Sequence, residues 1–337
     1  MSEKRIQVAL DAMGGDNAPQ APIKGAIDAI QESNEVDIIC LGKEEEIKAE
    51  LAKYTYDANR IQIVNCTEVI ETAEHPVNAI RSKKDSSIVK GMMMVRNGEC
   101  DAFVSAGSTG AVLVGGQILV GRVKGVERPP LAPVIPTEEG CALLLDCGAN
   151  VDAKASNLIQ FARMGSLYME NVMGVKNPRV ALLNIGAEEE KGNALVRETM
   201  PLLRECKDLN FIGSIEARDV PYGGADVIVT EAFAGNVCLK MYEGVGSFLL
   251  KQIKGTLMSS LVTKIGALLI KGALKKTLKR FDLDQYGGAP MLGLKGLVVK
   301  THGSANHKEV KNTILQCIAF SKQSLPEKIE KAVAAAE

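Results

Sequence analysis

Short apolar runs rich in β-branched residues alternate along this 337-residue chain with longer segments of helical period. This alternation is typical of a mostly parallel β-sheet with helices on both faces, so we expect a three-layer α/β fold. The expected strands are 6–10, 36–41, 61–64, 102–105, 141–146, 180–184, 211–213, 227–230 and 297–300. The expected helices are 19–32, 86–97, 109–121, 156–173, 193–206, 235–252 and 305–323, with Asn17, Ser108, Ser156 and Ser304 as N-caps of four of them.

The sequence contains no internal repeat and no low-complexity linker, and the proline-rich stretch at 129–136 is too short to separate domains. A chain of this length buries roughly three quarters of the surface that its unfolded form exposes, so it needs no disulfide or metal to hold a core. We therefore expect residues 1–337 to form a single α/β catalytic domain.

The charge of the chain is unevenly distributed. The formal net charge is −1, which argues against a generic nucleic-acid binder, but residues 244–281 contain no acidic residue and carry a charge of +8, leaving about −9 on the rest. Apolar residues at helical spacing over 257–269 precede most of these basic residues. We expect a projecting, basic amphipathic helical segment at about 245–284, suited to a membrane surface or an acidic protein partner. A helix packed in a dimer interface is the alternative, and paired helices projecting from a dimer would satisfy both.

The cysteines and the amino terminus indicate the compartment. Eight cysteines include no C-x-x-C pair, and most lie in apolar runs, where a free thiol behaves as a small buried hydrophobe. The first residues lack the apolar stretch of a signal peptide, and no window reaches 18 consecutive apolar residues. We expect a reduced, cytoplasmic protein.

Five loops combine glycine with small polar residues at or near the carboxyl ends of expected strands. They are DAMGGDNAP (11–19), SAGSTGA (105–111), NIGAEEEKGN (184–193), EAFAGNV (231–237) and THGSANH (301–307). Ligands of open parallel sheets bind at this edge, and glycines followed by a helix start present backbone N–H groups to an anion. None of the loops matches a P-loop or a G-x-G-x-x-G motif, so a nucleotide has weak support. A tight turn is the alternative for each loop alone, but five loops expected at one sheet edge favour an anion site.

Histidine is scarce in this chain. His75 precedes an expected helix and is interpreted as structural, whereas His302 follows a strand and could equally bind an anion or serve the fold. There is no H-E-x-x-H motif and no cluster of histidine and carboxylate residues at ligand spacing, so we expect no catalytic metal and no cofactor.

Two further residues could carry chemistry. Lys191 follows three glutamates and precedes Gly192 at an expected helix start, so it is either a solvated charge paired with those glutamates or an ammonium aimed into the cleft. Asn236 offers an uncharged donor at another helix start, or caps that helix.

Longer motifs in this chain resemble one family. The series DAMGGD, SAGSTGA, RPPLAP, LLLDCGANVDAK, NIGAEEEKGN, FIGSIEARD, AFAGNV, YGGAPMLGLKG and THGS follows the order seen in the PlsX family of phosphate acyltransferases. The resemblance covers essentially the whole chain. It implies a Rossmann-like fold similar to that of phosphotransacetylases and isopropylmalate dehydrogenases.

The resemblance also implies an activity. Inorganic phosphate would attack the thioester of a long-chain acyl-[acyl-carrier-protein], giving acyl phosphate for phosphatidic acid and phospholipid synthesis. It implies a homodimer, peripheral at the membrane, whose product passes to a membrane glycerol-3-phosphate acyltransferase. The partners would be acyl carrier protein, phosphate and the membrane surface, with no nucleic acid.

Specific residues match the family's motifs. The lysine and asparagine that the family is thought to use in catalysis fall on Lys191 and Asn236. Such groups could offset the negative charge of the tetrahedral transition state. The expected phosphate- and substrate-binding residues are Asp11, Gly14, Gly15, Ser108, Thr109, Gly110, Asn193, His302, Gly303 and Ser304, and the expected membrane or carrier-protein contacts are Leu257, Leu261, Ile265, Lys271, Lys275, Lys276, Lys279 and Arg280.

One residue departs from the family's pattern. Ser108 stands where many relatives have asparagine, which predicts altered ligand contacts rather than lost activity.

Two other functions compete with phosphate acyl transfer. A nucleotide-dependent dehydrogenase of the same fold would need an acidic ribose-binding residue and metal carboxylates that the sequence does not place. A membrane-surface scaffold without enzymatic activity would use only 250–282 and would tolerate changes in the five loops.

Overall fold

The described structure, a computed structural model, covers residues 5–188, 190–279 and 283–335. The chain divides into two compact units. Unit 1 comprises 1–133, 163–176 and 284–337, and unit 2 comprises 134–162 and 177–283. Whether the units fold together as the expected single domain stays a prediction.

Unit 1 is built on a six-stranded sheet in the order β10-β11-β4-β1-β2-β3. All neighbours pair in parallel except β10, which runs antiparallel to β11. The central strands are continuous apolar runs, as expected where both faces of a parallel sheet are buried. The strands are β1 (Ile6–Asp11), β2 (Val36–Gly42), β3 (Ile61–Asn65), β4 (Ala102–Ser105), β10 (Ala289–Pro290) and β11 (Leu297–Lys300).

Helices pack against this sheet and against one another. Helix α1 packs along α10, α3 packs on α5, and both α4 and α10 contact β1 and β4. Helix α5 continues directly into a π-helical turn at Gly116–Val120. The unit 1 helices are α1 (Gln20–Glu32), α2 (Glu44–Leu51), α3 (Pro76–Ser82), α4 (Ser87–Asn97), α5 (Thr109–Gly115), α10 (His307–Lys322) and α11 (Leu325–Ala334), with a 3-10 turn at Ala58–Arg60.

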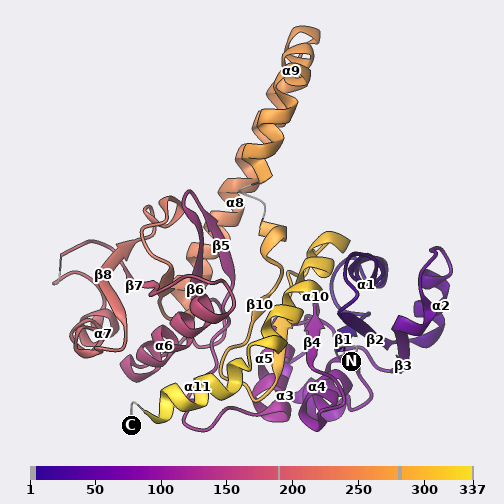
Figure 1. Cartoon of the computed structure of the whole chain (residues 1–337), viewed down its shortest axis with the longest axis horizontal. Helices are drawn as coiled ribbons and strands as arrows, with labels where there is room; N and C mark the ends of the chain where they lie inside the picture. The colour runs from indigo at the N-terminus through magenta and orange to yellow at the C-terminus, as the bar shows by residue number, and fades with distance from the viewer. Residues whose placement is uncertain (1–4, 189, 280–282, 336–337) are drawn as a thin grey trace. The chain divides into compact units, whose positions relative to one another are not determined.

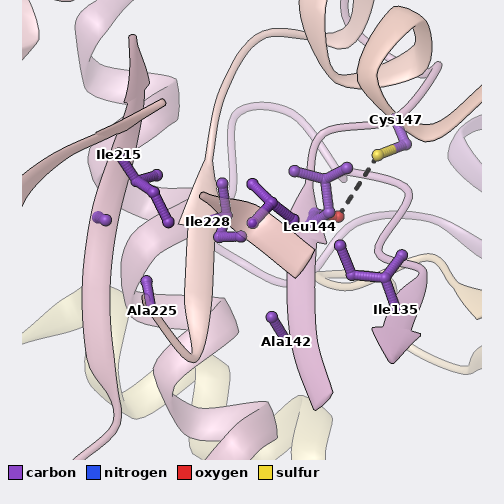
Figure 2. Packing of buried hydrophobic residues seen from close by; sticks show 9 residues of the cluster. Ile135, Ala142, Leu144, Cys147, Ile215, Ala225 and Ile228 are labelled. Carbon is purple, nitrogen blue, oxygen red and sulfur yellow. Dashed lines mark hydrogen bonds between the residues drawn. The ribbon is translucent and has the colours of Figure 1, made fainter. Parts of the chain in front are cut away.

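Unit 2 has its own five-stranded sheet in the order β5-β6-β9-β7-β8, parallel except for β5 against β6. Figure 2 shows part of its core, where side chains such as Ile135, Leu144 and Ile228 from neighbouring strands meet beside Cys147. Its strands are β5 (Val134–Thr137), β6 (Gly140–Leu145), β7 (Arg179–Asn184), β8 (Asn210–Glu216) and β9 (Val227–Val229). Its helices are α6 (Ala155–Asn171, which continues into unit 1), α7 (Ala194–Glu205), α8 (Ala232–Leu257) and α9 (Leu261–Lys279). A 3-10 turn lies at Val220–Tyr222, and another at Leu283–Tyr286, where the chain passes into unit 1.

Helices α8 and α9 extend away from the sheet of unit 2 (Figure 1). Cys238 and Leu239 anchor the start of α8 on the core, while most of α9 is exposed, with Leu261 79% and Leu269 81% accessible. No single helix in the described part of the chain is both long and apolar enough to cross a membrane. By length and composition alone, α8 and α9 together pass that test as a pair bent by 119°.

The expectation of one continuous helix across 257–269 is wrong, because the chain breaks between α8 and α9. Ser259 and Ser260, which a continuous helix over 257–269 would include, lie in the break. The Ser260 hydroxyl accepts from Thr263 N at 3.1 Å, and Thr263 Oγ1 accepts from Ser260 N at 3.0 Å. These reciprocal bonds start a new helix, so local capping overrides the apolar periodicity.

The expected α/β class with mostly parallel pairing is confirmed, but the strands form two sheets rather than one. Each expected strand is present, and α3 follows His75 as expected, whereas the antiparallel strands β5 and β10 were not anticipated, nor were helices α2 and α11. Both strands are short and contain a proline, which is unusual within a sheet and obscures their strand character in the sequence, although each pairs with the strand that follows it in the chain.

Three expected N-caps are wrong, and one is confirmed. Ser108 caps α5, accepting from Ala111 N at 3.4 Å. Asn17 instead donates to the carbonyls of Ser304 and Ala305, and Ser156 lies inside α6. Ser304 precedes α10, which is capped by Asn306. Several polar residues near each helix start can serve as a cap, and the exact first turn decides among them.

Candidate active site

The five glycine-rich loops follow strands of both sheets. The loops after β1, β4 and β11 belong to unit 1, where these three strands are neighbours in the order β11-β4-β1. The loops after β7 and β9 belong to unit 2, where those strands are also neighbours. The expectation that all five lie on the edge of one sheet is therefore wrong, because the chain starts a second sheet after residue 133.

A buried polar cluster holds the loops of unit 1 together. Asp11, which is 1% exposed, accepts from the Ser105 hydroxyl at 2.7 Å and from Met13 N at 3.1 Å. Ser105 Oγ in turn accepts from Gly107 N at 3.0 Å. Burial raises the pKa of Asp11, while hydrogen bonds from Ser87 and Ser105 oppose that shift. A single carboxyl group thus connects the loops after β1 and β4.

The glycines of the first loop permit a very close approach. A Cβ on Gly14 would lie 2.4 Å from Asp11 Oδ2 and 2.6 Å from Gly107 N. Gly15 adopts a φ of +93°, and a Cβ there would lie 2.8 Å from the Gly303 carbonyl oxygen. The next residue, Asp16, donates its N–H to that same carbonyl at 2.7 Å. The structure therefore brings Asp11, Gly14, Gly15 and Gly303 together, as a phosphate site in unit 1 requires.

The loop after β4 presents the start of α5. Ser108 is buried and serves as the cap, Thr109 is exposed, and Gly110 is half-buried. A Cβ on Gly110 would lie 2.5 Å from Pro76, at the contact between α3 and α5. Ser108 is therefore the hydroxyl cap of α5, and the altered ligand contacts expected from this residue stay a prediction.

His302 and Ser304 form a local pair. His302 is exposed, and its Nδ1 lies 2.7 Å from Ser304 Oγ and accepts from Ser304 N at 3.2 Å. The His302 backbone N–H donates to Glu309 at 2.9 Å. His75, interpreted as structural, occupies the N-cap position of α3 without a side-chain bond to it.

The loop after β7 carries Lys191. The Asn184 side chain closes this loop, donating to the Gly186 carbonyl at 3.0 Å and the Lys191 carbonyl at 3.2 Å. The Lys191 ammonium pairs with Glu188 at 2.8 Å, and the side chain is 50% exposed. The hydrogen bond that Lys191 donates to Glu188 raises the pKa of Lys191, so the side chain stays cationic at neutral pH. The structure therefore shows the Lys191 ammonium paired with Glu188, which is the first of the two alternatives considered for this residue.

Two asparagines on this edge of unit 2 differ in role. Asn193 is exposed and caps α7, accepting from Val196 N at 2.9 Å. Asn236 is half-buried and does not cap α8, because Glu231 does so by accepting from Phe233 N and Ala234 N. The Asn236 side chain is therefore not committed to capping.

The loop after β6 belongs to the motif LLLDCGANVDAK, but none of its residues was predicted to serve the site. Asp146 is fully buried and accepts from Ala149 N at 3.1 Å and from Asn150 N and Nδ2 at 2.7 Å each. A Cβ on Gly235 would lie only 1.9 Å from the Asp146 carbonyl oxygen. An aspartate that ends an apolar strand and is followed by Cys-Gly-Ala-Asn is the signal that could have revealed this loop. Lys300, at the end of β11, is a second buried charge that was not predicted, and the sequence carries no sign of its burial.

In the part of the chain that the structure describes, no group of three or more histidine, cysteine, aspartate or glutamate side chains could hold a metal ion. Charged groups at or just after strand ends include the buried Asp11 and Asp146 carboxylates and the buried Lys300 ammonium, and the loop after β7 carries the exposed Lys191 ammonium. Within each unit, the ammonium group and the loop N–H groups suit anion binding and charge stabilisation.

The comparisons with known proteins agree with this chemistry. The family described as "Fatty acid synthesis protein" matches residues 6–328. A phosphate acyltransferase of Clostridium novyi is 49% identical over 325 residues, covering 96% of this chain and 98% of that protein. One of Clostridium botulinum is 49% identical over 327 residues, covering 97% and 98%.

A solved structure of similar fold is a phosphotransacetylase from Staphylococcus aureus, with a TM-score of 0.62, 17% identity and 94% coverage of both chains. At that identity the likeness concerns the fold, and it fits the expected Rossmann-like architecture. The family match and the close relatives together show that this chain belongs to the PlsX family of phosphate acyltransferases, enzymes of lipid synthesis.

Proposed function

We propose that this enzyme transfers a long-chain acyl group from acyl-[acyl-carrier-protein] to inorganic phosphate. A phosphate oxygen attacks the thioester carbonyl carbon, the C–S bond breaks, and the carrier protein leaves with a free thiol. The product, acyl phosphate, supplies phosphatidic acid and phospholipid synthesis. The observation that carries this proposal is the Lys191 ammonium, exposed at the carboxyl edge of a parallel sheet and paired with Glu188.

The residues of each unit have distinct roles in this proposal. In unit 1, the backbone N–H groups at Gly14, Gly15 and Ser108–Gly110 bind phosphate, with His302, Gly303 and Ser304 beside them. In unit 2, Lys191 and Asn236 stabilise the negative charge that develops on the carbonyl oxygen, and Asn193 orients the Lys191 loop through its cap. Preorganised donors of this kind contribute about 3 to 4 kcal/mol each.

The reaction can be tested with purified protein, palmitoyl-[acyl-carrier-protein] and phosphate. We expect acyl phosphate and carrier-protein thiol in equal amounts, and no thiol release without phosphate. Thiol release that does not depend on phosphate would indicate a thioesterase, and no release at all would refute the proposal.

We further propose that α9 and the end of α8 contact the membrane surface and the acidic carrier protein. Leu261 and Ile265 are 79% and 63% exposed, and Leu257 is half-buried at the end of α8. Lys271, Lys275 and Lys276 are exposed further along α9, whereas the Lys279 side chain and Arg280 lie outside the described residues. Exposed leucines followed by lysines match an interfacial helix, whose apolar residues enter the lipid boundary while its cations attract anionic head groups.

These assignments imply a cytoplasmic homodimer, peripheral at the membrane, that passes its product to a membrane glycerol-3-phosphate acyltransferase. Sedimentation with anionic vesicles tests the membrane contact: the Leu261→Glu, Ile265→Glu variant should remain in the supernatant while the unaltered enzyme pellets. Leu202→Glu, Ile212→Glu is the matched control, because it adds the same two charges at other exposed apolar residues of unit 2. Equal pelleting of all three proteins would refute the membrane contact.

A further inference from the structure

Lys300 is a buried cation beneath the glycine-rich loops of unit 1. It is the last residue of β11 and only 6% exposed, and its ammonium donates to the Thr301 carbonyl. Burial lowers the pKa of Lys300 to about 8. An isolated buried ammonium is strongly unfavourable, so its neighbours must compensate the charge.

Lys300 is paired in register with Ser105 of the neighbouring strand β4, and the Ser105 hydroxyl donates to Asp11 of β1. The charges of Asp11, of Asp16 in the loop after β1 and of Glu309 in α10 all favour the charged form of Lys300. Glu309 accepts from His302 N, and the Asp16 N–H donates to the Gly303 carbonyl. Asp11 accepts from Met13 N, and Ser105, which donates to Asp11, accepts from Gly107 N. The carboxylates that act on Lys300 are thus the ones connected to the loops after β1, β4 and β11.

This arrangement resolves an electrostatic conflict in the proposed phosphate site. Asp11 Oδ2 lies only 2.4 Å from the position of a Cβ on Gly14, and 3.1 Å from that of a Cβ on Gly107. An anionic carboxylate so close to the loops that bind phosphate would repel the ligand, most strongly where water is excluded. Hydrogen bonds from Ser87, Ser105 and Met13 stabilise the anion but do not cancel its charge.

We propose that Lys300 is a positioning residue for phosphate, whose ammonium offsets the charge of Asp11 so that the loops after β1, β4 and β11 can hold an anionic ligand. This inference rests on the proposed function, which assigns phosphate to these loops. Lys300 acts through Asp11 and is not assigned a contact with the reacting atoms.

A double-mutant cycle tests this role. Lys300→Met keeps most of the side-chain volume and removes the charge, so we expect the KM for phosphate to rise at least tenfold while the KM for the acyl substrate stays the same. Adding Asp11→Asn removes the charge that Lys300 offsets, and should restore most of the lost phosphate affinity. The matched control adds Glu309→Gln to Lys300→Met, and should restore less.

The outcomes separate a positioning role from a structural one. An unchanged phosphate KM in Lys300→Met, or a double variant with Asp11→Asn no better than the single one, overturns the inference. Circular dichroism melting shows whether each variant folds. If Lys300→Met alone fails to fold, the Asp11→Asn, Lys300→Met variant decides the question. A phosphate KM close to that of the unaltered enzyme then supports the inference, and a high phosphate KM overturns it. Failure of the proposed function is distinct, because the unaltered enzyme would then show no phosphate-dependent turnover.

The pH profile supplies a readout that packing alone would not change. As pH rises through about 8, the unaltered enzyme loses the Lys300 charge. We therefore compare the phosphate KM of Lys300→Met with that of the unaltered enzyme at each pH and expect the ratio of the two values to fall towards one. The ionisation of phosphate affects both values equally and cancels in the ratio. The pKa of Lys191 is raised, so Lys191 keeps its charge in this range. A ratio independent of pH would contradict the proposal.

Discussion

The loops of unit 1 and the Lys191 loop of unit 2 hold their charges in opposite ways. In unit 1, Asp11 and Lys300 are almost fully buried, and Asp11 accepts several hydrogen bonds that link neighbouring loops. In unit 2, Lys191 is half exposed and pairs with Glu188 three residues away. A buried network fixes geometry because each broken bond leaves an unpaired polar group, whereas an exposed pair exchanges partners at little cost. The loops of unit 1 are therefore held rigidly, whereas the Lys191 side chain can exchange partners at little cost.

The comparison is tested most strongly by removing Lys191. Lys191→Ala should lower kcat about 100- to 1000-fold, equivalent to about 3 to 4 kcal/mol of transition-state stabilisation. Because the side chain is half exposed, the free energy of unfolding should change by less than about 0.5 kcal/mol. Steady-state kinetics and urea denaturation measure the two effects, with Lys207→Ala as an exposed-lysine control. Similar kcat values for the Lys191→Ala and Lys207→Ala variants would show that Lys191 has no catalytic role.

A second prediction concerns the scaffold beneath the exposed loops of unit 2. Gly235→Ala would place a Cβ 1.9 Å from the Asp146 carbonyl, so α8 or the loop after β6 must move. We expect a loss of about 3 kcal/mol in the free energy of unfolding. Gly246→Ala in the same helix meets nothing within 4 Å and should stabilise the protein by about 0.5 to 1 kcal/mol. Equal stability of the two variants in urea denaturation would show that the contact is not tight.

The buried ammonium of unit 1 predicts a pH dependence of stability. The pKa of Lys300 is lowered to about 8 in the folded state, against 10.5 as its ordinary value, so the unfolded chain binds more protons between these pH values. The free energy of unfolding should therefore gain up to about 3 kcal/mol from this residue as pH rises from 8 to 10.5. Lys300→Met should lack this contribution in urea denaturation at several pH values. The same rise in both proteins would show that Lys300 is not responsible.

The smallest expected effect is at the start of α5. Ser108→Ala removes the cap on Ala111 N and should cost about 1 kcal/mol in the free energy of unfolding. Ser108→Asn introduces the residue more usual in the family and should retain the cap. Thermal melting of the three proteins measures the difference, and a Ser108→Ala variant as stable as the unaltered enzyme would show that the bond contributes nothing.

Much of the architecture could be predicted because it depends on local rules. The apolar strands β1, β4 and β11 lie within one residue of their expected positions, and α7 starts at the expected glycine-asparagine turn. Cys40 and Cys147 are buried, as expected for thiols in apolar runs. These features follow from residue period and turn chemistry, which act over a few neighbouring residues.

The errors share a different origin. Ser260 starts a new helix through bonds to Thr263 that the apolar pattern of 257–269 conceals. Asn17 binds carbonyls about 290 residues away instead of capping α1. Lys300 received no attention because a lysine at the end of a strand is usually solvated, and only its surroundings show that it is buried.

By itself, the sequence determined the α/β class, the glycine-rich loops at or near strand ends and the resemblance to phosphate acyltransferases, since motif and period are properties of short segments. Only the tertiary structure decided that the strands form two sheets, that Glu188 pairs with Lys191, and that Asp11 and Lys300 share a buried site. The reason is physical. Strand partnership and the burial of a charge depend on which distant segments meet, and those long-range contacts set both the pKa of Lys300 and the role proposed for it.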